Sequence, residues 1–398
     1  MATVGAMSKK KLGFLMASCV VMVTLVAASS LGQPSPKNNL YRYLSIFTEV
    51  FSLVRSSYVD GVAPDQLVEG AFSGVTDAVD EFSYYVPPAE MRLYQGFKED
   101  EVNGVGLVVT KRYGYAFVIS ALEGSEAAVA GVKSGDFIEA VNGKLTQKMP
   151  IWQIRTAIRG GAGKTVDLKI LRGGMTKRDE VTIKRGPFDA PDPTPRYVGD
   201  IAIIKVPFFE KDAASKFAKA LQTVKESGKK KLIVDLRGNA GGSIVEAIAA
   251  VDHLLASGVI TSLQGRRVEQ KRWTADPQLS FEGDVQVLTD STTAAGAEIF
   301  AAAIHGNKRG KITGTSTFGK AGFQKFVQLP SGGGLNMTIG YYTTPELKAI
   351  KEQGVRPDTV VDLSAAAIKD ESAGETEPDL IMIKALELFA EKKERAAA

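Results

Sequence analysis

The chain has 398 residues, of which 44% are hydrophobic and 24% charged, so it can bury a sizeable core and divide into more than one domain. This composition excludes a disordered, collagen-like or multi-span membrane protein. Four of the 49 basic residues lie in residues 1–37, which contain no acid, and the remaining 45 balance the 45 acidic residues. A neutral body lacks the basic surface that binds nucleic acid, so no nucleic-acid partner is expected.

Cysteine and histidine are scarce. The single cysteine, Cys19, excludes an internal disulfide and a cysteine-based zinc site. The two histidines, His253 and His305, leave little room for histidine-rich metal chemistry. We therefore expect neither a metal nor another cofactor.

Residues 1–37 have the layout of a secretory signal peptide or a membrane anchor. Lys9–Lys11 precede an uncharged run whose apolar part ends near Ala28. This stretch is longer than the ~7–15 apolar residues of a cleaved signal and about as long as the shortest membrane-spanning helix. We expect an uncleaved anchor within residues 12–31, with a cleaved signal as the alternative. The basic flank should stay in the cytoplasm, which places the body in the bacterial cell envelope, in the periplasm or another extracytoplasmic space.

The next segments predict a helical region followed by a small β-domain. Residues 38–97 favour helices, because apolar residues such as Leu44, Phe47 and Val54 recur every three or four positions until Pro87-Pro88. Short strands are predicted at 106–109, 115–119, 166–171 and 180–183, with a helix at 151–158. Four prolines between 187 and 195 mark a linker or domain boundary.

Beyond residue 200, strands and helices alternate. Strands are expected at 201–206, 231–236 and 285–289, and helices at 213–227, 243–256, 295–305 and 379–393. Alternation at this spacing predicts a layered α/β core with a largely parallel sheet.

Gly104-Val105-Gly106-Leu107 is a glycine-rich turn that opens a predicted strand. Such a turn can present backbone amides to a terminal carboxylate, while the edge of the strand pairs with an extended peptide. A small β-domain with glycine turns and no ligand would show the same pattern. These four residues are nevertheless our candidates for peptide binding.

A second glycine-rich turn, Gly238–Ser243, follows a hydrophobic strand and precedes a helix. The turn can aim backbone amides at a phosphate or an oxyanion. No Gly-Lys-Ser/Thr follows, so the phosphate-binding lysine motif is not met. We expect Gly241 and Gly242 to form an oxyanion hole, although a tight strand-to-helix turn without a ligand would look alike.

A lysine and a glutamate stand in the remaining short segments. Lys320 lies in a glycine-lined apolar turn, where burial would lower its pKa and make a general base of it. An isolated lysine is more often a solvated surface charge. Glu298 opens a helix, where a structural role competes with positioning of the neighbouring turn. Trp152 is expected to pack, although it lies on a helix that would flank the peptide groove.

Together these segments resemble the C-terminal processing peptidases, or tail-specific proteases, of the S41 serine peptidase family, over roughly residues 45–363. The segments that carry the resemblance are Tyr58–Asp60, Gly70-Ala71, the string from Gly104 to Gly143, Asp235–Gly242, Glu298–Ala301, Thr317–Lys320, Tyr341–Pro345 and Gly354–Asp358.

The resemblance implies an α/β multidomain protein. Its expected parts are a signal peptide or membrane anchor in residues 1–37, an N-terminal helical region in 38–97, a PDZ β-domain in 98–186, an α/β S41 protease-like core in 187–365 and a C-terminal helical tail in 366–398. The family uses a serine–lysine dyad with a glutamine four residues after the lysine, and Lys320 and Gln324 occupy those two positions.

The nucleophile departs from the family pattern. Aligned through Thr293-Ala294 and Glu298-Ile299, the attacking serine falls on Ala295. A methyl group cannot form an acyl-enzyme, so covalent catalysis at this position is lost. Ser291, Thr292 or Thr293 could act as nucleophile in its place. A shift of one residue along the turn, however, moves the attacking oxygen by about 3 Å or more, which is too far to assume a working geometry.

Two functions follow from the resemblance. The first is a catalytically impaired homologue that binds protein C-terminal tails through its PDZ domain, as an adaptor, decoy or regulator of an active protease partner. The second is an active serine-type endopeptidase that uses Lys320 as base and a displaced serine or threonine nucleophile.

Overall fold

The computed structural model describes residues 22, 36–96, 104–161, 163–173, 175–276, 279–351, 353–363 and 378–397. The anchor expected at residues 12–31, and Cys19 within it, lie outside the described residues except for Met22. The chain forms two compact units, one up to Ala71 and one from Phe72 onward. None of the helices in the described ranges combines the length and apolar character needed to cross a bilayer.

The helical prediction for residues 38–97 is confirmed in its first part. Helix α2 spans Pro36–Ser57 and α3 spans Pro64–Asp77. The prediction is wrong for Tyr84–Val86, which form strand β1 before the short helices η1 (Pro88–Glu90) and α4 (Met91–Gln95). Strand β1 pairs antiparallel with residues 334–336, so its conformation depends on a partner distant in sequence.

The predicted β-domain is an antiparallel sheet in the order β2-β3-β4-β6-β7, with β5 beside β4. The predicted strands and helix are confirmed with somewhat longer bounds. The elements are β2 (Leu107–Arg112), β3 (Tyr115–Ala121), α5 (Glu126–Val129), β4 (Phe137–Val141), β5 (Lys144–Leu145), η2 (Thr146–Lys148), α6 (Ile151–Arg159), β6 (Thr165–Arg172) and β7 (Lys177–Lys184). Helix α6 buries Ile151, Trp152, Ile154 and Ile158 in the core of this domain.

The α/β core is built on a six-stranded sheet in the order β17-β14-β13-β10-β9-β8. All neighbouring pairs are parallel except β8 with β9. The strands are β8 (Pro195–Val198), β9 (Ile201–Lys205), β10 (Lys231–Asp235), β13 (Asp284–Thr289), β14 (Gly310–Gly314) and β17 (Thr359–Val360). The largely parallel sheet predicted from the alternating pattern is therefore confirmed.

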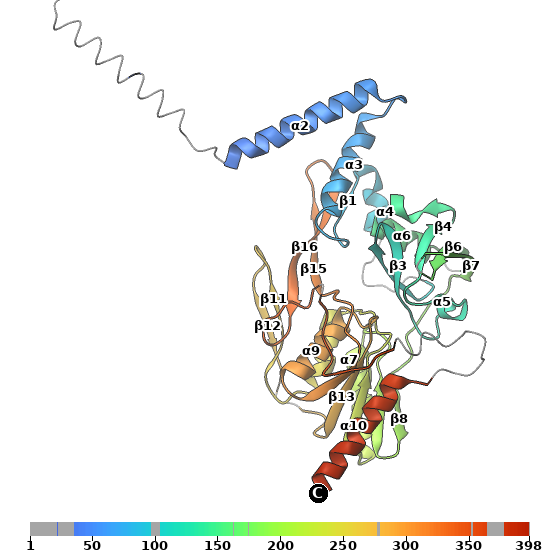
Figure 1. Ribbon diagram of the computed structural model, residues 1–398, viewed down its shortest axis with the longest axis vertical. Coiled ribbons are helices and arrows are strands. Elements are labelled where there is room, and N and C mark those ends of the chain that lie inside the picture. Colours follow the sequence, from blue (N-terminus) through green and yellow to red (C-terminus); the bar gives the residue numbers. More distant parts are fainter. Residues whose placement is uncertain are drawn as a thin grey trace, which may run out of the picture. The chain divides into compact units, whose positions relative to one another are not determined.

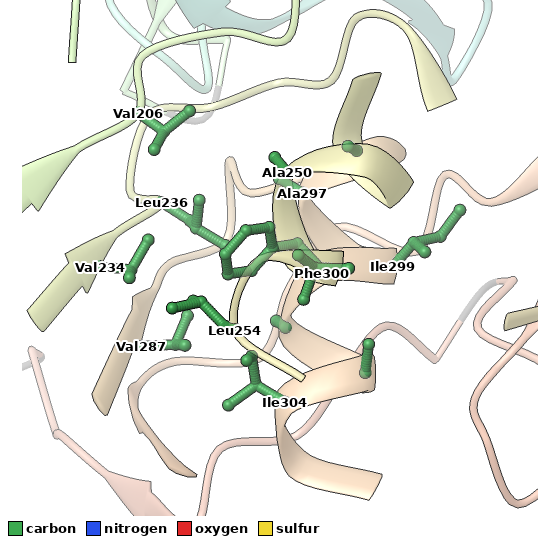
Figure 2. Close-up of a cluster of buried hydrophobic side chains, with 14 of the residues drawn as sticks. Val206, Val234, Leu236, Ala250, Leu254, Val287, Ala297, Ile299, Phe300 and Ile304 are labelled. Carbon is green, nitrogen blue, oxygen red and sulfur yellow. The ribbon is translucent and has the colours of Figure 1, made fainter. Parts of the chain in front are cut away.

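Helices cover both faces of this sheet (Figure 1). On one face lie α7 (Ala213–Glu226), α8 (Ile244–Asp252) and α9 (Gly296–Gly306), whose apolar residues pack on alternate residues of the strands. Figure 2 shows Phe300 of α9 among Val234, Leu254 and Val287. On the other face, α10 (Leu380–Ala397) packs on Ile201, Ile203, Ile233 and Leu288.

A further sheet, not anticipated from the sequence, borders the core. It joins β1, β16 (Gly334–Thr343), β11 (Val259–Gln264) and β12 (Lys271–Thr274), and β15 (Gly322–Gln328) also pairs with β16. Strand β15 begins two residues after Lys320, so this sheet holds one end of the lysine-bearing turn.

Candidate active site

Three turns meet at the carboxyl edge of the parallel sheet. They follow β10, β13 and β14, which are adjacent and parallel, so their carboxyl ends lie side by side. The first turn holds Gly241 and Gly242, the second Ala295 and the third Lys320. The fold therefore gathers at one edge the residues that the sequence singled out for chemistry.

Ala295 has a strained backbone, with φ 50° and ψ −113°. A residue with a Cβ rarely adopts such angles, which cost on the order of 1–3 kcal/mol and are concentrated at functional sites. Ala295 stands on the short turn between β13 and α9. A serine on a sharp, strained strand-to-helix turn is how several hydrolases present their nucleophile. Ala295 has the backbone of such a turn, but its side chain is a methyl group. That position 295 is the nucleophile position stays a prediction.

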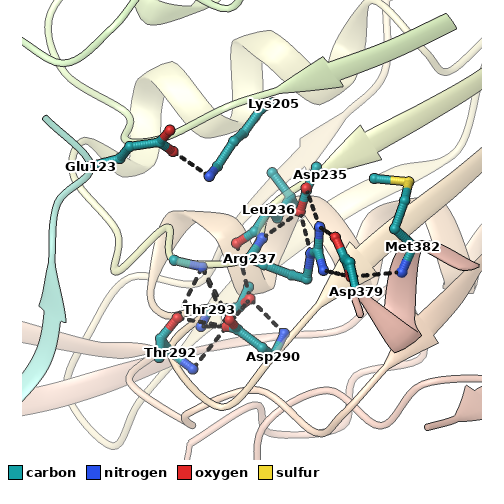
Figure 3. Close-up of polar contacts among 11 residues, drawn as sticks. Glu123, Lys205, Asp235, Leu236, Arg237, Asp290, Thr292, Thr293, Asp379 and Met382 are labelled. Atoms are coloured by element: carbon teal, nitrogen blue, oxygen red, sulfur yellow. Dashed lines mark hydrogen bonds and ion pairs between the residues drawn. The ribbon is translucent and has the colours of Figure 1, made fainter. Parts of the chain in front are cut away.

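The neighbouring threonines are committed to other bonds (Figure 3). Thr293 is fully buried, and its hydroxyl donates to the Leu236 carbonyl at 3.0 Å and accepts the Asp290 amide at 3.0 Å. The Thr292 hydroxyl donates to Asp290 Oδ1 at 2.6 Å and accepts the Gly238 amide at 2.9 Å. Both hydroxyls tie the second turn to the first.

The turn that holds Gly241 and Gly242 lies in close contact with Ala295. Gly241 and Gly242 have φ of +124° and +101°. A Cβ on Gly242 would lie 2.2 Å from the Phe209 carbonyl oxygen. A Cβ on Gly241 would lie 3.0 Å from the Cβ of Ala295. Only glycine fits this approach.

The amide of Gly241 is engaged in this conformation. It donates to Asn239 Oδ1 at 3.0 Å, and the Asn239 side chain, fully buried, donates to the Val206 carbonyl at 2.9 Å. Asn239 is a residue of the site that sequence reasoning missed, although it stands inside the glycine motif. Gly241 and Gly242 as oxyanion donors stay a prediction.

Glu298 joins the turn that holds Ala295 to the turn that holds Lys320. Its fully buried carboxylate accepts the Ala295 amide at 2.8 Å, the Thr317 hydroxyl at 2.5 Å, the Gly319 amide at 2.6 Å and the Lys320 amide at 2.8 Å. Burial raises the pKa of Glu298 to about 7, although the four hydrogen bonds oppose this rise. Of the two roles left open for Glu298, these contacts favour positioning of both turns.

Lys320 and Gln324 lie on the third turn and on β15. Lys320 is half-buried, between buried Gly319 and Ala321. Gln324 is also half-buried, and its side-chain nitrogen lies 3.3 Å from Thr338 Oγ1 on β16. Their roles as base and orienting partner stay predictions.

The predicted peptide-binding turn leads into an edge strand. Val105 and Gly106 accept backbone hydrogen bonds from Ala127 and Leu122, which fix the turn at the start of β2. Strand β2 is the terminal strand of its sheet, as pairing with an extended peptide requires. Arg155 of α6 donates to the Val109 carbonyl on β2, with Nη2 at 3.2 Å, a contact that the sequence did not indicate.

Trp152 packs inside the domain, as expected. It is fully buried and meets Tyr94 of α4 edge to face, with ring centroids 5.5 Å apart. Tyr94 in turn stacks on Phe326 of β15 at 4.5 Å. An aromatic column therefore links α6 to the strand that follows the lysine turn.

The β-domain also contacts the site directly. The Ser120 hydroxyl on β3 donates to the Gly238 carbonyl at 2.8 Å. Ile119 of β3 packs in one apolar cluster with Ala240 and Ala294, and Phe117 stacks near Phe318. Residues 117–120 of β3 therefore contact all three turns of the site.

Comparison with known proteins agrees with these features. A model of the family described as Peptidase family S41 matches residues 200–361, and a PDZ domain model matches residues 117–172. The carboxy-terminal-processing protease of Bartonella bacilliformis is 30% identical over 355 residues, which cover 88% of this chain and 80% of the relative. The carboxy-terminal processing protease CtpA of Bacillus subtilis is 26% identical over 363 residues, covering 86% and 76%.

A solved structure supports the fold. The photosystem II D1 C-terminal processing protease matches with a TM-score of 0.66 and 23% identity, over 80% of this chain and 92% of that one. The expected combination of N-terminal helices, a PDZ domain and an S41 protease core is confirmed.

Proposed function

Because the chain belongs to the S41 family of carboxy-terminal-processing proteases, we propose that it binds the C-terminal tails of other proteins through its PDZ domain and hydrolyses them poorly or not at all. We place the PDZ domain at residues 98–186, the protease-like core at 187–365 and the helical tail at 366–398, after an anchor or signal in 1–37 and an N-terminal region in 38–97 that is helical except for β1.

The observation that carries this proposal is the alanine at position 295. Its φ of 50° and ψ of −113° keep the strained turn in which a nucleophile would be presented, while the side chain offers no oxygen. The surrounding groups remain in place: the glycine turn against Ala295, and Glu298 between Ala295 and Lys320. A framework of this kind without a hydroxyl at position 295 favours tail binding over peptide hydrolysis.

The alternative is an active endopeptidase with Lys320 as base and a displaced serine or threonine. The hydroxyls of Thr292 and Thr293 each bond Asp290 in their own turn and one backbone group after β10, so freeing either would break contacts that hold the site together. This argues for impairment.

Binding in the PDZ domain would use the Gly104–Leu107 turn for the terminal carboxylate and the edge of β2 for the peptide backbone. The binding partners are then polypeptides with free C-terminal carboxylates. An exported location in the bacterial envelope and an active protease that this chain regulates are further parts of the proposal, motivated by residues 9–28 and by Ala295.

The proposal is tested with the purified protein and an unfolded substrate that ends in apolar residues. The unmodified protein should bind the free-acid form and cleave it negligibly, and amidation of the substrate C-terminus should weaken binding at least about tenfold, since the carboxylate contact is a charge-assisted one. Ala295→Ser should restore partial hydrolysis. Adding Lys320→Ala to that variant should lower hydrolysis again by roughly 10²- to 10⁴-fold, the usual contribution of a general base.

Two results would contradict the proposal. Equal binding of acid and amide peptides would remove the carboxylate contact. Cleavage by the unmodified protein that is lost in Lys320→Ala would contradict the impairment and favour the active endopeptidase with Lys320 as base.

A further inference from the structure

Arg237 stands between strand β10 and the glycine turn and binds two carboxylates (Figure 3). Its Nε and Nη2 donate to the oxygens of Asp235, which is almost fully buried, at 2.8 and 2.7 Å. Its Nη1 and Nη2 donate to the oxygens of Asp379 at 2.5 and 2.9 Å. Both contacts are bidentate, the arrangement in which a guanidinium holds a carboxylate most specifically.

Asp379 belongs to the start of α10, far from the turn in sequence. Besides binding Arg237, it accepts the Met382 amide at 2.9 Å and so caps the N-terminus of α10. The apolar face of the helix, Ile381, Met382, Ala385 and Phe389, packs on the sheet face opposite α7, α8 and α9. The helix and the turn are therefore joined through one side chain, Arg237.

The charges of this cluster are mutually stabilised. Burial alone would lower the pKa of Arg237, but the hydrogen bonds and charges of Asp235 and Asp379 raise it above its ordinary value. Burial would raise the pKa of Asp379, but the hydrogen bonds from Arg237 and the Met382 amide lower it. Arg237 and Asp379 are therefore both charged at neutral pH, and the link between them persists there.

The residue after Arg237 continues the link into the site. The Gly238 amide donates to Thr292 Oγ1 at 2.9 Å and to Asp290 Oδ2 at 3.2 Å. Gly238, Gly241 and Gly242 all have positive φ, and glycines lose the most conformational freedom when they are ordered. Such a turn needs restraint from outside, and Arg237 supplies it at one end.

We propose that Asp379 is a positioning residue of the site, which fixes the glycine turn Gly238–Gly242 by holding Arg237, so that the order of this turn depends on the N-terminus of α10. The proposal rests on the proposed function in one respect, because it takes this turn to be the one that would hold the substrate carbonyl. It assigns the C-terminal helix a role in the site besides covering the sheet.

The test is hydrogen exchange of the full chain, read in peptides that cover residues 236–243 and α10. Asp379→Asn keeps an oxygen that caps the helix but removes the charge that holds Arg237. Exchange in the turn should become on the order of tenfold faster, the factor that corresponds to losing one charge-assisted hydrogen bond, while α10 stays protected. Asp379→Glu, which restores the carboxylate, should recover part of the protection.

Lys384→Gln is the matched control, because it removes a charge from the same helix in an exposed pair with Glu387. It should leave the turn unchanged. The proposal is overturned if Asp379→Asn leaves exchange at 236–243 unchanged, or if it speeds exchange equally in the turn, α10 and the central strands, which would be a general loss of stability.

A second readout separates this proposal from the proposed function. In an Ala295→Ser background that hydrolyses substrate, Asp379→Asn should lower kcat with little change in KM, because the turn would contact the reacting carbonyl. If Ala295→Ser gives no hydrolysis, the proposed function is weakened, while the exchange result still decides the role of Asp379.

Discussion

At the scale of single residues, Glu298 carries the most information about how the site is held. It is the third residue of α9, and its carboxylate reaches back to the amide of Ala295, as in a helix capping box. The same carboxylate accepts two amides and a hydroxyl of the lysine turn. These four donors come from both turns, so one carboxylate fixes the two turns relative to each other.

We expect Glu298 to make the stability of the core depend on pH. Its pKa is raised to about 7 in the folded protein, whereas an unfolded chain titrates near the ordinary value of about 4.3. Between these values the folded state holds a proton that the unfolded state has lost. Stability attributable to this group is therefore highest below pH ~4.3, falls by at most about 1.4 kcal/mol per pH unit up to pH ~7, and is constant above.

The measurement is urea unfolding of the unmodified protein and of Glu298→Gln at several values between pH 5 and 8. The difference between the two free energies of unfolding should change with pH in that direction. Glu226→Gln, on an exposed position of α7, is the control and should show no such trend. Parallel curves for the unmodified protein and Glu298→Gln would show that Glu298 does not titrate in this range.

At the scale of elements, helix α6 is fixed by a residue outside it. Arg185 is almost fully buried and donates to three carbonyls, those of Ala157 at 2.7 Å, Ile158 at 2.9 Å and Thr165 at 2.5 Å. The first two belong to the last turn of α6, where carbonyls lack helical partners and a cation is favoured. Gly160 (φ +46°) is required beside it, because a Cβ there would lie 2.5 Å from the guanidinium.

We expect Arg185→Met to destabilise the PDZ domain by roughly 2–4 kcal/mol, because it leaves buried carbonyls without donors while it keeps most of the aliphatic stem. Arg178→Met on β7 is the control. Arg178 is exposed and pairs with Glu139 at 3.3 Å, so its loss should cost about 1 kcal/mol or less. Chemical denaturation of both variants checks the prediction, and equal losses would contradict the role given to Arg185.

At the scale of the whole molecule, the two faces of the core sheet are covered differently, one by three helices and the other by α10. Three helices cover one face, with Phe217 of α7 and Phe300 of α9 among their fully buried residues. On the other face, α10 supplies Ile381, Met382, Ala385 and Phe389. This helix therefore completes the core of a sheet whose strands β9 and β10 lie more than a hundred residues earlier in the chain.

Phe389→Ala should lower the free energy of unfolding of the core by about 3–5 kcal/mol, since it removes a large buried ring that also lies 5.8 Å from the Lys231 ammonium. Ile383→Ala on the exposed side of α10 is the matched control and should cost roughly 1 kcal/mol or less. The measurement is the unfolding midpoint of each variant, which should fall much further for Phe389→Ala than for Ile383→Ala. A small loss for Phe389→Ala would mean that α10 adds little to the core.

The sequence alone determined the features that depend on neighbouring residues. Alternation of apolar strands and helices predicted the parallel sheet, and the glycine turns at 104–107 and 238–243 were found by their composition. Aligned with the family pattern through Thr293-Ala294 and Glu298-Ile299, the sequence also predicted that Ala295 stands where the family has its serine. Local periodicity and turn chemistry act over a few residues, so they are legible in one sequence.

Only the tertiary structure decided what depends on partners distant in the chain. Strand β1 forms by pairing with β16, and its three residues, 84–86, are too few to show a strand pattern in the sequence. The strain at Ala295, the four donors around Glu298 and the link from Arg237 to Asp379 arise where three turns and a remote helix converge. Such contacts are set by the order in which strands associate and by which faces the helices cover, and a linear pattern does not encode either directly.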